Sequence, residues 1–258
     1  MNENMGILKK DYGVDQIEPE VTHCGIEGLV SVQARQIIEE TDWLISIAKN
    51  SELVRGVVGW VDLRDERKLG EQLERLKNEN YLKGVRHVVH DEPDDNFILG
   101  KKFNEGIRTL LPTKLVYDIL IFAKHLPNTI QFVDQHPNQV FVVDHIAKPT
   151  IRSAEFDATW AKNLKELSKR KNVWCKFSGV VTEVRDPAWD LKSIKPYWDV
   201  AIESFGPERL MYGSDWPVCL LRSEYVRWAE TVEELTKSLS ESESARFWGG
   251  NATEAYNL

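Results

Sequence analysis

Strand-like and helix-like segments alternate along the whole sequence, and this alternation predicts an α/β protein with a parallel β-sheet. Each short run of apolar and β-branched residues is followed by a polar stretch in which apolar residues recur three and four positions apart. An open doubly wound sheet usually carries a glycine-rich phosphate loop after an early strand, and neither GxGxxG nor GxxxxGKS/T occurs here. These observations favour the closed (β/α)8 TIM-barrel type over the open sheet.

Seven strands are recognisable, and each ends in or near a polar residue that a fully buried strand would not need. The predicted strands cover residues 28–34, 54–63, 84–90, 115–121, 139–146, 172–179 and 209–216. Their polar residues are, in the same order, Gln33, Asp62, His87 with His90, Asp118, His145, Lys176 and Asp215. Ionisable groups are costly to bury unless they pair or take part in chemistry. Because barrel active sites lie at the C-terminal ends of the strands, this series indicates a shared pocket.

The segments between the strands carry apolar stripes at helical spacing. Such stripes are typical of the buried faces of amphipathic helices, so we assign them to the core and not to a cofactor site. The stripes are Leu69, Leu73 and Leu76; Phe103, Ile107 and Leu110; Trp160, Leu164 and Leu167; and Trp198, Ala201, Ile202 and Phe205.

A closed barrel of this type has eight strands, and the sequence supplies seven. The helix predicted after the seventh strand is followed by a short tail with no strand-like run. The missing strand should therefore precede residue 28, but residues 1–22 are polar and contain no β-branched run. We expect a single domain over residues 1–258 that lacks the first strand of the barrel.

The composition is that of a globular protein with an acidic balance. Its 258 residues are 42% hydrophobic and 29% charged, with 33 Lys+Arg against 41 Asp+Glu and a net charge of −8. With no basic stripe, this balance argues against nucleic-acid binding and favours a small-molecule substrate. No apolar run approaches the roughly 18 residues of a membrane span, and residues 1–12 lack the apolar core of a signal peptide.

The cysteines indicate a reducing compartment. Cys24, Cys175 and Cys219 are far apart, odd in number and form no CxxC motif, which favours buried thiols over a disulfide or a zinc site. We expect a cytoplasmic protein with no membrane partner, and a homo-oligomer is compatible with the sequence.

Four segments resemble the amidohydrolase-related family (amidohydrolase 2). They are GVVGWVDL at 56–63, VVDHIAKP at 142–149, CKFSG at 175–179 and GSDWPV at 213–218. Within that family they are similar to the branch that includes L-fucono- and L-rhamnono-lactonases, and the resemblance covers the chain from about Met5. It implies a (β/α)8 barrel that hydrolyses lactones, often of sugar acids.

The resemblance also implies that a first strand with an HxH pair is missing, because no HxH occurs in the sequence. Catalytic zinc sites use about three protein ligands, and His145 with Asp215 supplies two candidates. We therefore expect no tightly bound metal in this chain, whereas a divalent metal such as zinc becomes an option if the native protein carries the HxH strand.

By resemblance, Asp215 and His145 are the catalytic candidates. Lactone hydrolysis needs a base beside a water molecule and a positive group near the carbonyl. Asp215 would bind a metal or take the proton of the water, and the alternative is a helix cap. Strand alternation lets only one of Asp144 and His145 point into the barrel. We choose His145 and expect Asp144 to support the contact with the outer helix.

Charged side chains on three predicted strands are candidates for substrate binding. Lys176 would polarise the substrate carbonyl or bind a carboxylate, and its alternative is an ion pair with a carboxylate such as Asp118. Arg86 and His87 alternate across their strand, so only one faces inward, and the spacing leaves open which. Asp118 is either a functional or a buried structural carboxylate.

Two further residues complete the predicted substrate-binding set. His125 follows a strand and would either reach the rim of the pocket or begin a helix, and Trp216, directly after Asp215, is a candidate aromatic wall. The leading hypothesis is a lactone hydrolase. A catalytically impaired, truncated barrel that acts as a binding protein is the first alternative, and a metal-assisted amidohydrolase or decarboxylase is the second.

Overall fold

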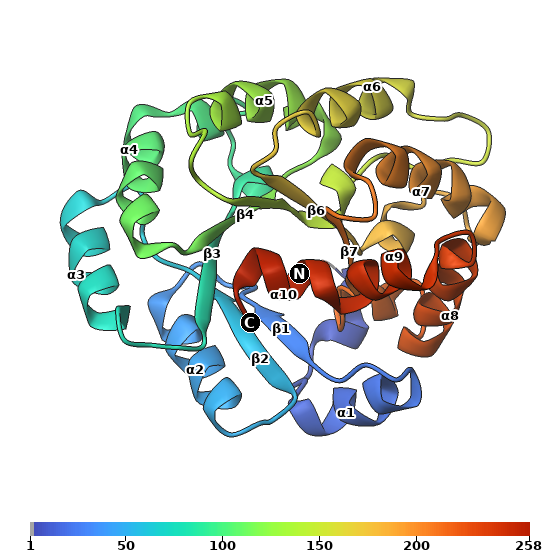
Figure 1. Ribbon diagram of the computed structural model, residues 1–258, viewed down its shortest axis with the longest axis horizontal. Coiled ribbons are helices and arrows are strands. Elements are labelled where there is room, and N and C mark those ends of the chain that lie inside the picture. The colour runs from blue at the N-terminus through green and yellow to red at the C-terminus, as the bar shows by residue number, and fades with distance from the viewer. Residues whose placement is uncertain (1–2) are drawn as a thin grey trace.

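The structure, a computed structural model, describes residues 3–258 and is built around one parallel sheet. Its seven strands follow one another in chain order, and the sheet curls around a central space (Figure 1). The strands are β1 (Leu29–Val32), β2 (Val54–Gly59), β3 (Leu82–Val88), β4 (Val116–Leu120), β5 (Phe141–Val143), β6 (Val173–Phe177) and β7 (Leu210–Tyr212). Sequential parallel pairing is the arrangement of a TIM-type barrel, so the predicted fold class is confirmed.

Helices connect the strands and cover the outer face of the sheet (Figure 1). The helices are α1 (Val14–His23), α2 (Ile38–Lys49), α3 (Glu66–Leu76), α4 (Lys101–Leu110), α5 (Leu126–Asp134), α6 (Ala158–Leu167), α7 (Leu191–Phe205), α8 (Tyr225–Thr236), α9 (Glu241–Ala245) and α10 (Asn251–Tyr256). Between each two consecutive strands lies one α-helix, α2 to α7 in order, which is the repeated βαβ unit, and α8, α9 and α10 follow β7. The predicted stripe residues Phe103, Ile107, Leu110, Trp160, Leu164 and Leu167 are all buried.

Most strands are shorter than the sequence predicts, because their polar residues lie in the loops that follow. The strand predicted at 139–146 is observed as Phe141–Val143, and the one predicted at 209–216 as Leu210–Tyr212. The chain leaves the extended conformation after these strands and enters positive φ at His145 and at Asp215. Apolar pattern alone does not show where a strand ends and a functional loop begins.

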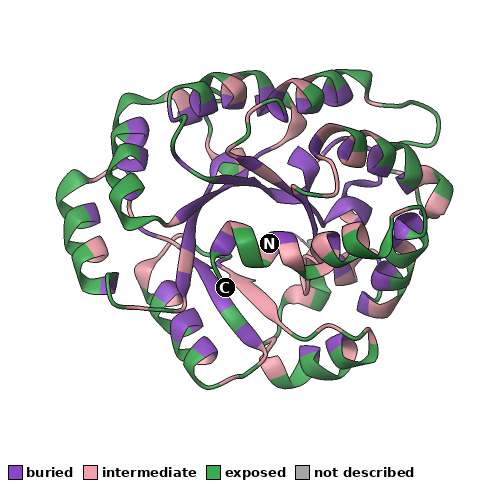
Figure 2. Ribbon diagram, in the orientation of Figure 1, coloured by how far each residue is buried: buried purple, intermediate pink, exposed green. Residues whose placement is uncertain are grey.

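The inner face of the sheet is apolar at its N-terminal end. Inward-pointing valines from β2, β4 and β5 meet Met211 of β7 and the C-terminal helix α10 in one cluster. Helix α10 lies inside the curl of the sheet (Figures 1 and 2). Its residues Ala252, Ala255 and Tyr256 pack against this floor. The C-terminal end of the sheet is therefore left for polar residues.

The sheet is open between its two outermost strands. β1 pairs with β2 and β7 pairs with β6, and β1 and β7 are not paired with each other. Among the described residues, the segment before β1 forms the 3-10 turn Glu3–Leu8 and helix α1, with no strand. Helix α1 packs through Ile17 and Val21 against Tyr225 and Ala229 of α8. As the strand count from the sequence predicts, residues 3–258 contain no strand before β1.

Within residues 3–258, no helix combines the length and the apolar character needed to cross a membrane.

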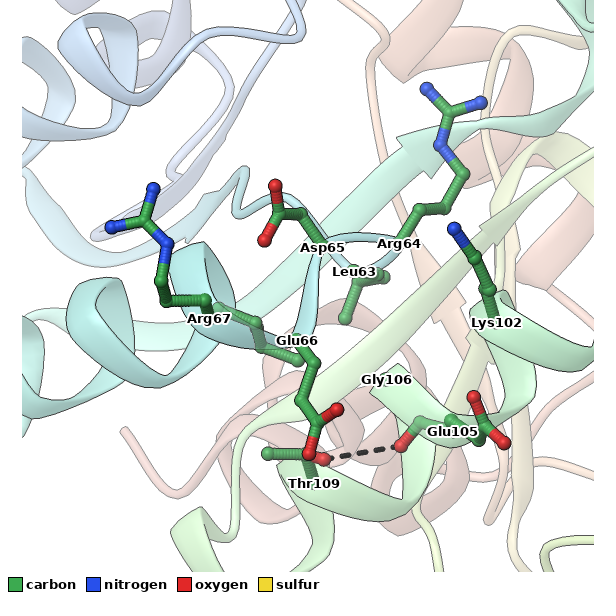
Figure 3. A pocket seen from close by; sticks show the side chains of 10 residues that line it. Leu63, Arg64, Asp65, Glu66, Arg67, Lys102, Glu105, Gly106 and Thr109 are labelled. Atoms are coloured by element: carbon green, nitrogen blue, oxygen red, sulfur yellow. Dashed lines mark hydrogen bonds between the residues drawn. The ribbon is translucent and has the colours of Figure 1, made fainter.

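Helix α4 packs so closely on the loop after β2 that residue 106 has no room for a side chain (Figure 3). An ideal Cβ on Gly106 would lie 2.0 Å from the backbone oxygen of Leu63. We expect Gly106→Ala to lower the free energy of unfolding by about 1–3 kcal/mol, the usual cost of overpacking, as measured by urea denaturation.

Gly70→Ala in α3 is the matched control, because no heavy atom lies within 4 Å of its ideal Cβ. This variant should gain up to about 1 kcal/mol from the higher helix propensity of alanine. Equal effects of the two substitutions would contradict the close packing of α4.

Candidate active site

Four charged side chains from neighbouring strands form one buried layer inside the curled sheet. Arg86 lies on β3, Asp118 on β4 and Lys176 on β6, and Asp144 directly follows β5. Arg86 and Asp118 are register partners across β3 and β4. Because side chains alternate along a strand, these residues share the inner face with the apolar floor below them. We call these four residues the charged layer.

Ion pairs connect the whole charged layer. Lys176 Nζ lies 2.5 Å from Asp118 Oδ2 and 2.7 Å from Asp144 Oδ1. Arg86 donates from Nη1 to Asp144 Oδ2 at 2.8 Å and from Nη2 to the backbone oxygen of Gln33. Gln33 Nε2 in turn donates to the backbone oxygen of Arg86 at 3.0 Å. Two cations and two carboxylates therefore compensate one another in the interior, where an unpaired charge would be costly.

Mutual attraction sets the protonation states of this layer. Burial opposes ionisation of Asp144, but Lys176 and Arg86 lower its pKa far below the usual value. Burial raises the pKa of Asp118 to about 6, against the opposing effect of Lys176. Burial also disfavours the charge of Lys176, but Asp118 and Asp144 raise its pKa well above the usual value. Near neutral pH the charged layer therefore holds two cations and two anions.

Asp215 and His145 form a second group above the charged layer. His145 Nε2 lies 3.6 Å from Asp215 Oδ1, and His145 Nδ1 lies 2.8 Å from the hydroxyl of Ser178. Burial raises the pKa of Asp215 to about 7. Burial also lowers the pKa of His145 well below its usual value. Near neutral pH the pair consists of an uncharged imidazole and a carboxyl group that is poised between its two forms.

Unusual backbone conformations bring this pair together. Residues 145–148 all have positive φ, with His145 at 53°, and Asp215 has a φ of 56°. Such values are uncommon outside glycine and concentrate at functional sites. Gly179 has a φ of 61°, and a Cβ there would lie 2.8 Å from Asp215 Oδ2 and 2.9 Å from His145 Nδ1. Only glycine at 179 allows the loop after β6 to pass this close to both side chains.

A cavity of about 1660 Å³ gives access to these residues. It extends from the pair and the charged layer toward the open side of the sheet, where β1 and α1 form its wall. Its lining includes Gln33, Arg86, Asp144, His145, Lys176, Ser178, Asp215 and Trp216. Trp216 meets Tyr12 edge to face at 5.0 Å between ring centroids.

A smaller hollow of about 660 Å³ lies elsewhere, between the start of α3 and α4 (Figure 3). Its rim mixes acidic and basic side chains from residues 64–67 with Lys102 and Glu105. None of the candidate site residues lines it. We therefore place the candidate active site in the larger cavity.

The structure brings together five of the predicted site residues at the cavity: Asp215, His145, Lys176, Arg86 and Trp216. Lys176 forms the ion pair with Asp118 that the sequence left as its alternative, and it still reaches the cavity. Arg86 is the member of the Arg86–His87 pair that points inward. Asp118 is fully buried beneath Lys176 and does not line the cavity, so its position favours the structural role.

The proposed substrate contacts of His87 and His125 have no support in the geometry. His87 points to the outer face of β3, stacks on Phe97 at 4.9 Å and contacts Glu92 Oε1 at 2.7 Å. His125 Nδ1 accepts a hydrogen bond from Phe122 N at the turn before α5. The alternation of β3 turns the first ring outward, and a capping role at the start of a helix holds the second.

Asp144 requires a correction. The expectation that it supports an outer helix is wrong, because its carboxylate points inward and pairs with Lys176 and Arg86. His145 reaches the cavity as well, since strand alternation no longer applies once the chain adopts a left-handed conformation at this residue. Ser178, which orients His145, was also missed, although it lies within the CKFSG segment.

The described residues do not form a metal site. Within residues 3–258, no group of three or more His, Cys, Asp or Glu side chains is arranged to hold an ion. His145 and Asp215 are two donor groups, and Asp144 adds no third because Lys176 and Arg86 occupy its oxygens. A catalytic zinc site uses about three protein ligands, so this donor set does not fit one.

The ion pairs of the charged layer predict that loss of Asp144 lowers the free energy of unfolding. Asp144→Asn removes one anion and leaves Lys176 and Arg86 with a single carboxylate, so we expect a loss of about 3–5 kcal/mol in the free energy of unfolding. Urea denaturation at pH 7 measures it. The control is Asp199→Asn, which breaks a 2.7 Å pair with Lys195 on the surface of α7 and should cost less than about 1 kcal/mol. Similar losses in both variants would contradict the central role of Asp144.

Three curated relatives that are named as lactonases match between 73% and 99% of the chain. An L-fucono-1,5-lactonase from Burkholderia multivorans is 38% identical over 98% of this chain and 88% of its own length. An L-fucono-1,5-lactonase from Burkholderia ambifaria is 32% identical over 99% of this chain and 89% of its own length. An L-rhamnono-gamma-lactonase from Scheffersomyces stipitis is 27% identical over 73% of this chain and 64% of its own length.

Solved structures agree with the fold and with the family. A crystal structure of an amidohydrolase from Burkholderia multivorans with bound HEPES has a TM-score of 0.95 and 37% identity, and covers 100% of this chain and 92% of that chain. A crystal structure of an amidohydrolase from the same organism with bound Zn has a TM-score of 0.94, with the same identity and coverage. The amidohydrolase family model matches residues 6–258. The chain therefore belongs to the amidohydrolase family.

Proposed function

We propose that this chain hydrolyses lactones, with sugar-acid lactones as the substrate class. The observation that carries the proposal is the Asp215–His145 pair, which lies at a cavity whose wall also contains Lys176 and Arg86. A carboxyl group with a pKa of about 7 is suited to serve as a general base at neutral pH. The lactonase names of the relatives support the choice of a cyclic ester.

In the proposed reaction, water attacks the carbonyl carbon of the ring ester. The 3.6 Å between His145 Nε2 and Asp215 Oδ1 is too long for a hydrogen bond and leaves the attacking water a position beside both groups. Ionised Asp215 takes one proton from this water as its oxygen bonds to carbon. The ester C–O bond then breaks, and the proton passes from Asp215 to the ring oxygen. The product is an open-chain hydroxy acid.

Lys176 of the charged layer supplies the positive group beside the substrate carbonyl. An ammonium group has three N–H donors, and two of those on Lys176 point to Asp118 and Asp144. The third is free to donate to the carbonyl oxygen, on which negative charge develops during attack. Arg86 would hold a second oxygen of the substrate. Since both cations are already paired, the layer adds little net charge to the unliganded site.

Aromatic rings favour a sugar-derived ring over a small aliphatic ester. Trp216 lines the cavity beside Asp215 and packs edge to face on Tyr12. Flat apolar rings suit the C–H face of a sugar, while polar residues bind its hydroxyls. We further propose that the chain's own residues carry out this reaction without a tightly bound metal, because within residues 3–258 two donor groups meet at the site, His145 and Asp215.

The catalytic assignment of Asp215 predicts the outcome of its isosteric replacement. We expect Asp215→Asn to lose lactone hydrolysis by at least about 100-fold, since general-base catalysis contributes roughly that factor or more. Proton release from a panel of sugar lactones measures it. Asparagine tolerates the positive φ at this position, and it removes a buried carboxylate whose raised pKa disfavours its charge. The melting temperature at pH 8 should therefore equal or exceed that of the wild type.

Asp199→Asn on the surface of α7 is the activity control and should leave turnover unchanged. Full activity of Asp215→Asn would refute the assignment of this residue as the base.

The raised pKa of Asp215 also predicts the pH dependence. A base must be deprotonated to accept a proton, so kcat/KM should fall as pH decreases through about 7 and should level off above it. His145 adds no second acidic step in this range, because burial keeps its imidazole neutral. A profile that is flat from pH 5 to pH 9 would contradict the role of Asp215.

A further inference from the structure

We propose that Tyr256 of helix α10 is a positioning residue that fixes Asp118, and through it the ammonium group of Lys176, beneath the substrate. This inference rests on the proposed lactone hydrolysis. It assigns a role in that reaction to the helix that fills the opposite end of the sheet. The closing segment NATEAY at 251–256 fits the family resemblance, but the sequence assigns no role to Tyr256, which lies 138 positions from Asp118.

The hydroxyl of Tyr256 is directed at Asp118. Its oxygen lies 2.9 Å from both Oδ1 and Oδ2 of that carboxylate, and both residues are buried. Burial and the neighbouring Asp118 raise the pKa of Tyr256 well above its usual value, so the phenol keeps its proton and acts as the donor. Lys176 Nζ lies 5.5 Å from the centre of the same ring. One tyrosine therefore contacts both members of the Asp118–Lys176 ion pair.

Helix α10 is anchored firmly enough for its tyrosine to hold a position. The buried side chain of Asn251 donates to the backbone oxygens of Pro207 and Leu210 at 2.6 Å each. Lys83 Nζ donates to the backbone oxygen of Asn257 at 2.8 Å. These contacts fix α10 to the segment that enters β7 and to β3. Hydrogen bonds at both ends of the helix thereby set the position of the Tyr256 hydroxyl relative to the sheet.

The consequence for Lys176 follows from its contacts. Asp118 has no other side-chain donors than Lys176 and Tyr256 among the described residues. Without the phenol, one buried carboxylate oxygen is left without a partner, which disfavours the charged form of Asp118 and weakens its ion pair with Lys176. This change moves or re-pairs the ammonium group. The third N–H of Lys176 then no longer points toward the position of the substrate carbonyl.

Tyr256→Phe tests this inference, because it removes only the hydroxyl. We expect kcat for lactone hydrolysis to fall about tenfold, the scale of one hydrogen bond to a charged group, with KM changed less than about twofold. Tyr117→Phe is the matched control: this buried tyrosine lies beside Asp118 on β4, faces the other way, and its hydroxyl has no partner in residues 3–258. The control should keep the activity of the wild type.

A double-mutant cycle with Asp118→Asn separates positioning from general loss of stability. If Tyr256 acts through Asp118, Tyr256→Phe has no further effect on kcat in the Asp118→Asn background. Additive losses would overturn the inference, and so would an unchanged kcat in the single variant.

A carboxyl titration keeps the inference separate from the proposed function. In protein labelled with ¹³C at aspartate carboxyl groups, and with Asp118→Asn used for assignment, Tyr256→Phe should raise the pKa of Asp118, whereas Tyr117→Phe should not. Failure of the wild type to hydrolyse any lactone would refute the proposed function alone, since the titration still reports the Tyr256–Asp118 coupling. An unshifted pKa of Asp118 would overturn the inference even in an active enzyme.

Discussion

The ion pairs that Lys176 makes with Asp118 and Asp144 are the interaction on which the rest of the structure depends. They connect β4, β5 and β6 across the inner face of the sheet. They also form the boundary between an apolar floor and a polar cavity. A buried cation is tolerated only with carboxylates in good geometry, and those carboxylates are ionised only because the cation is present. Each of the three groups therefore fixes the position and the protonation state of the other two.

The architecture was predictable because it depends on patterns that repeat. Seven apolar runs separated by helical stripes predict a parallel α/β sheet, and the register observed between β3 and β4 follows the expected alternation. The ends of strands were not predictable, since Asp144 and His145 continue an apolar run without a glycine or proline to mark the change. Residues 145–148 adopt a left-handed backbone conformation although none of them is glycine, so residue type does not mark this turn.

The site residues that could be predicted from the sequence are those that lie at or near the C-terminal ends of predicted strands. Asp215, His145, Lys176 and Arg86 meet at one cavity because parallel strands carry their C-terminal ends to the same edge. His87 and His125 do not line this cavity, and residue type alone cannot distinguish a packed or capping histidine from a functional one. Tyr256 was beyond sequence reasoning, because only the path of α10 inside the sheet brings it to Asp118.

The charged layer and Asp215 differ in how their charges affect the free energy of folding. The charged layer is internally neutral at pH 7, and it loses this balance only as the pH falls toward about 6, the pKa of Asp118. Asp215 has only distant cations and a raised pKa, so its ionisation costs folding free energy while it supplies a base. Above pH 7 a neutralised layer lies below the titrating carboxyl group of Asp215, so the reactivity of the site changes with pH while the ion pairs beneath it persist.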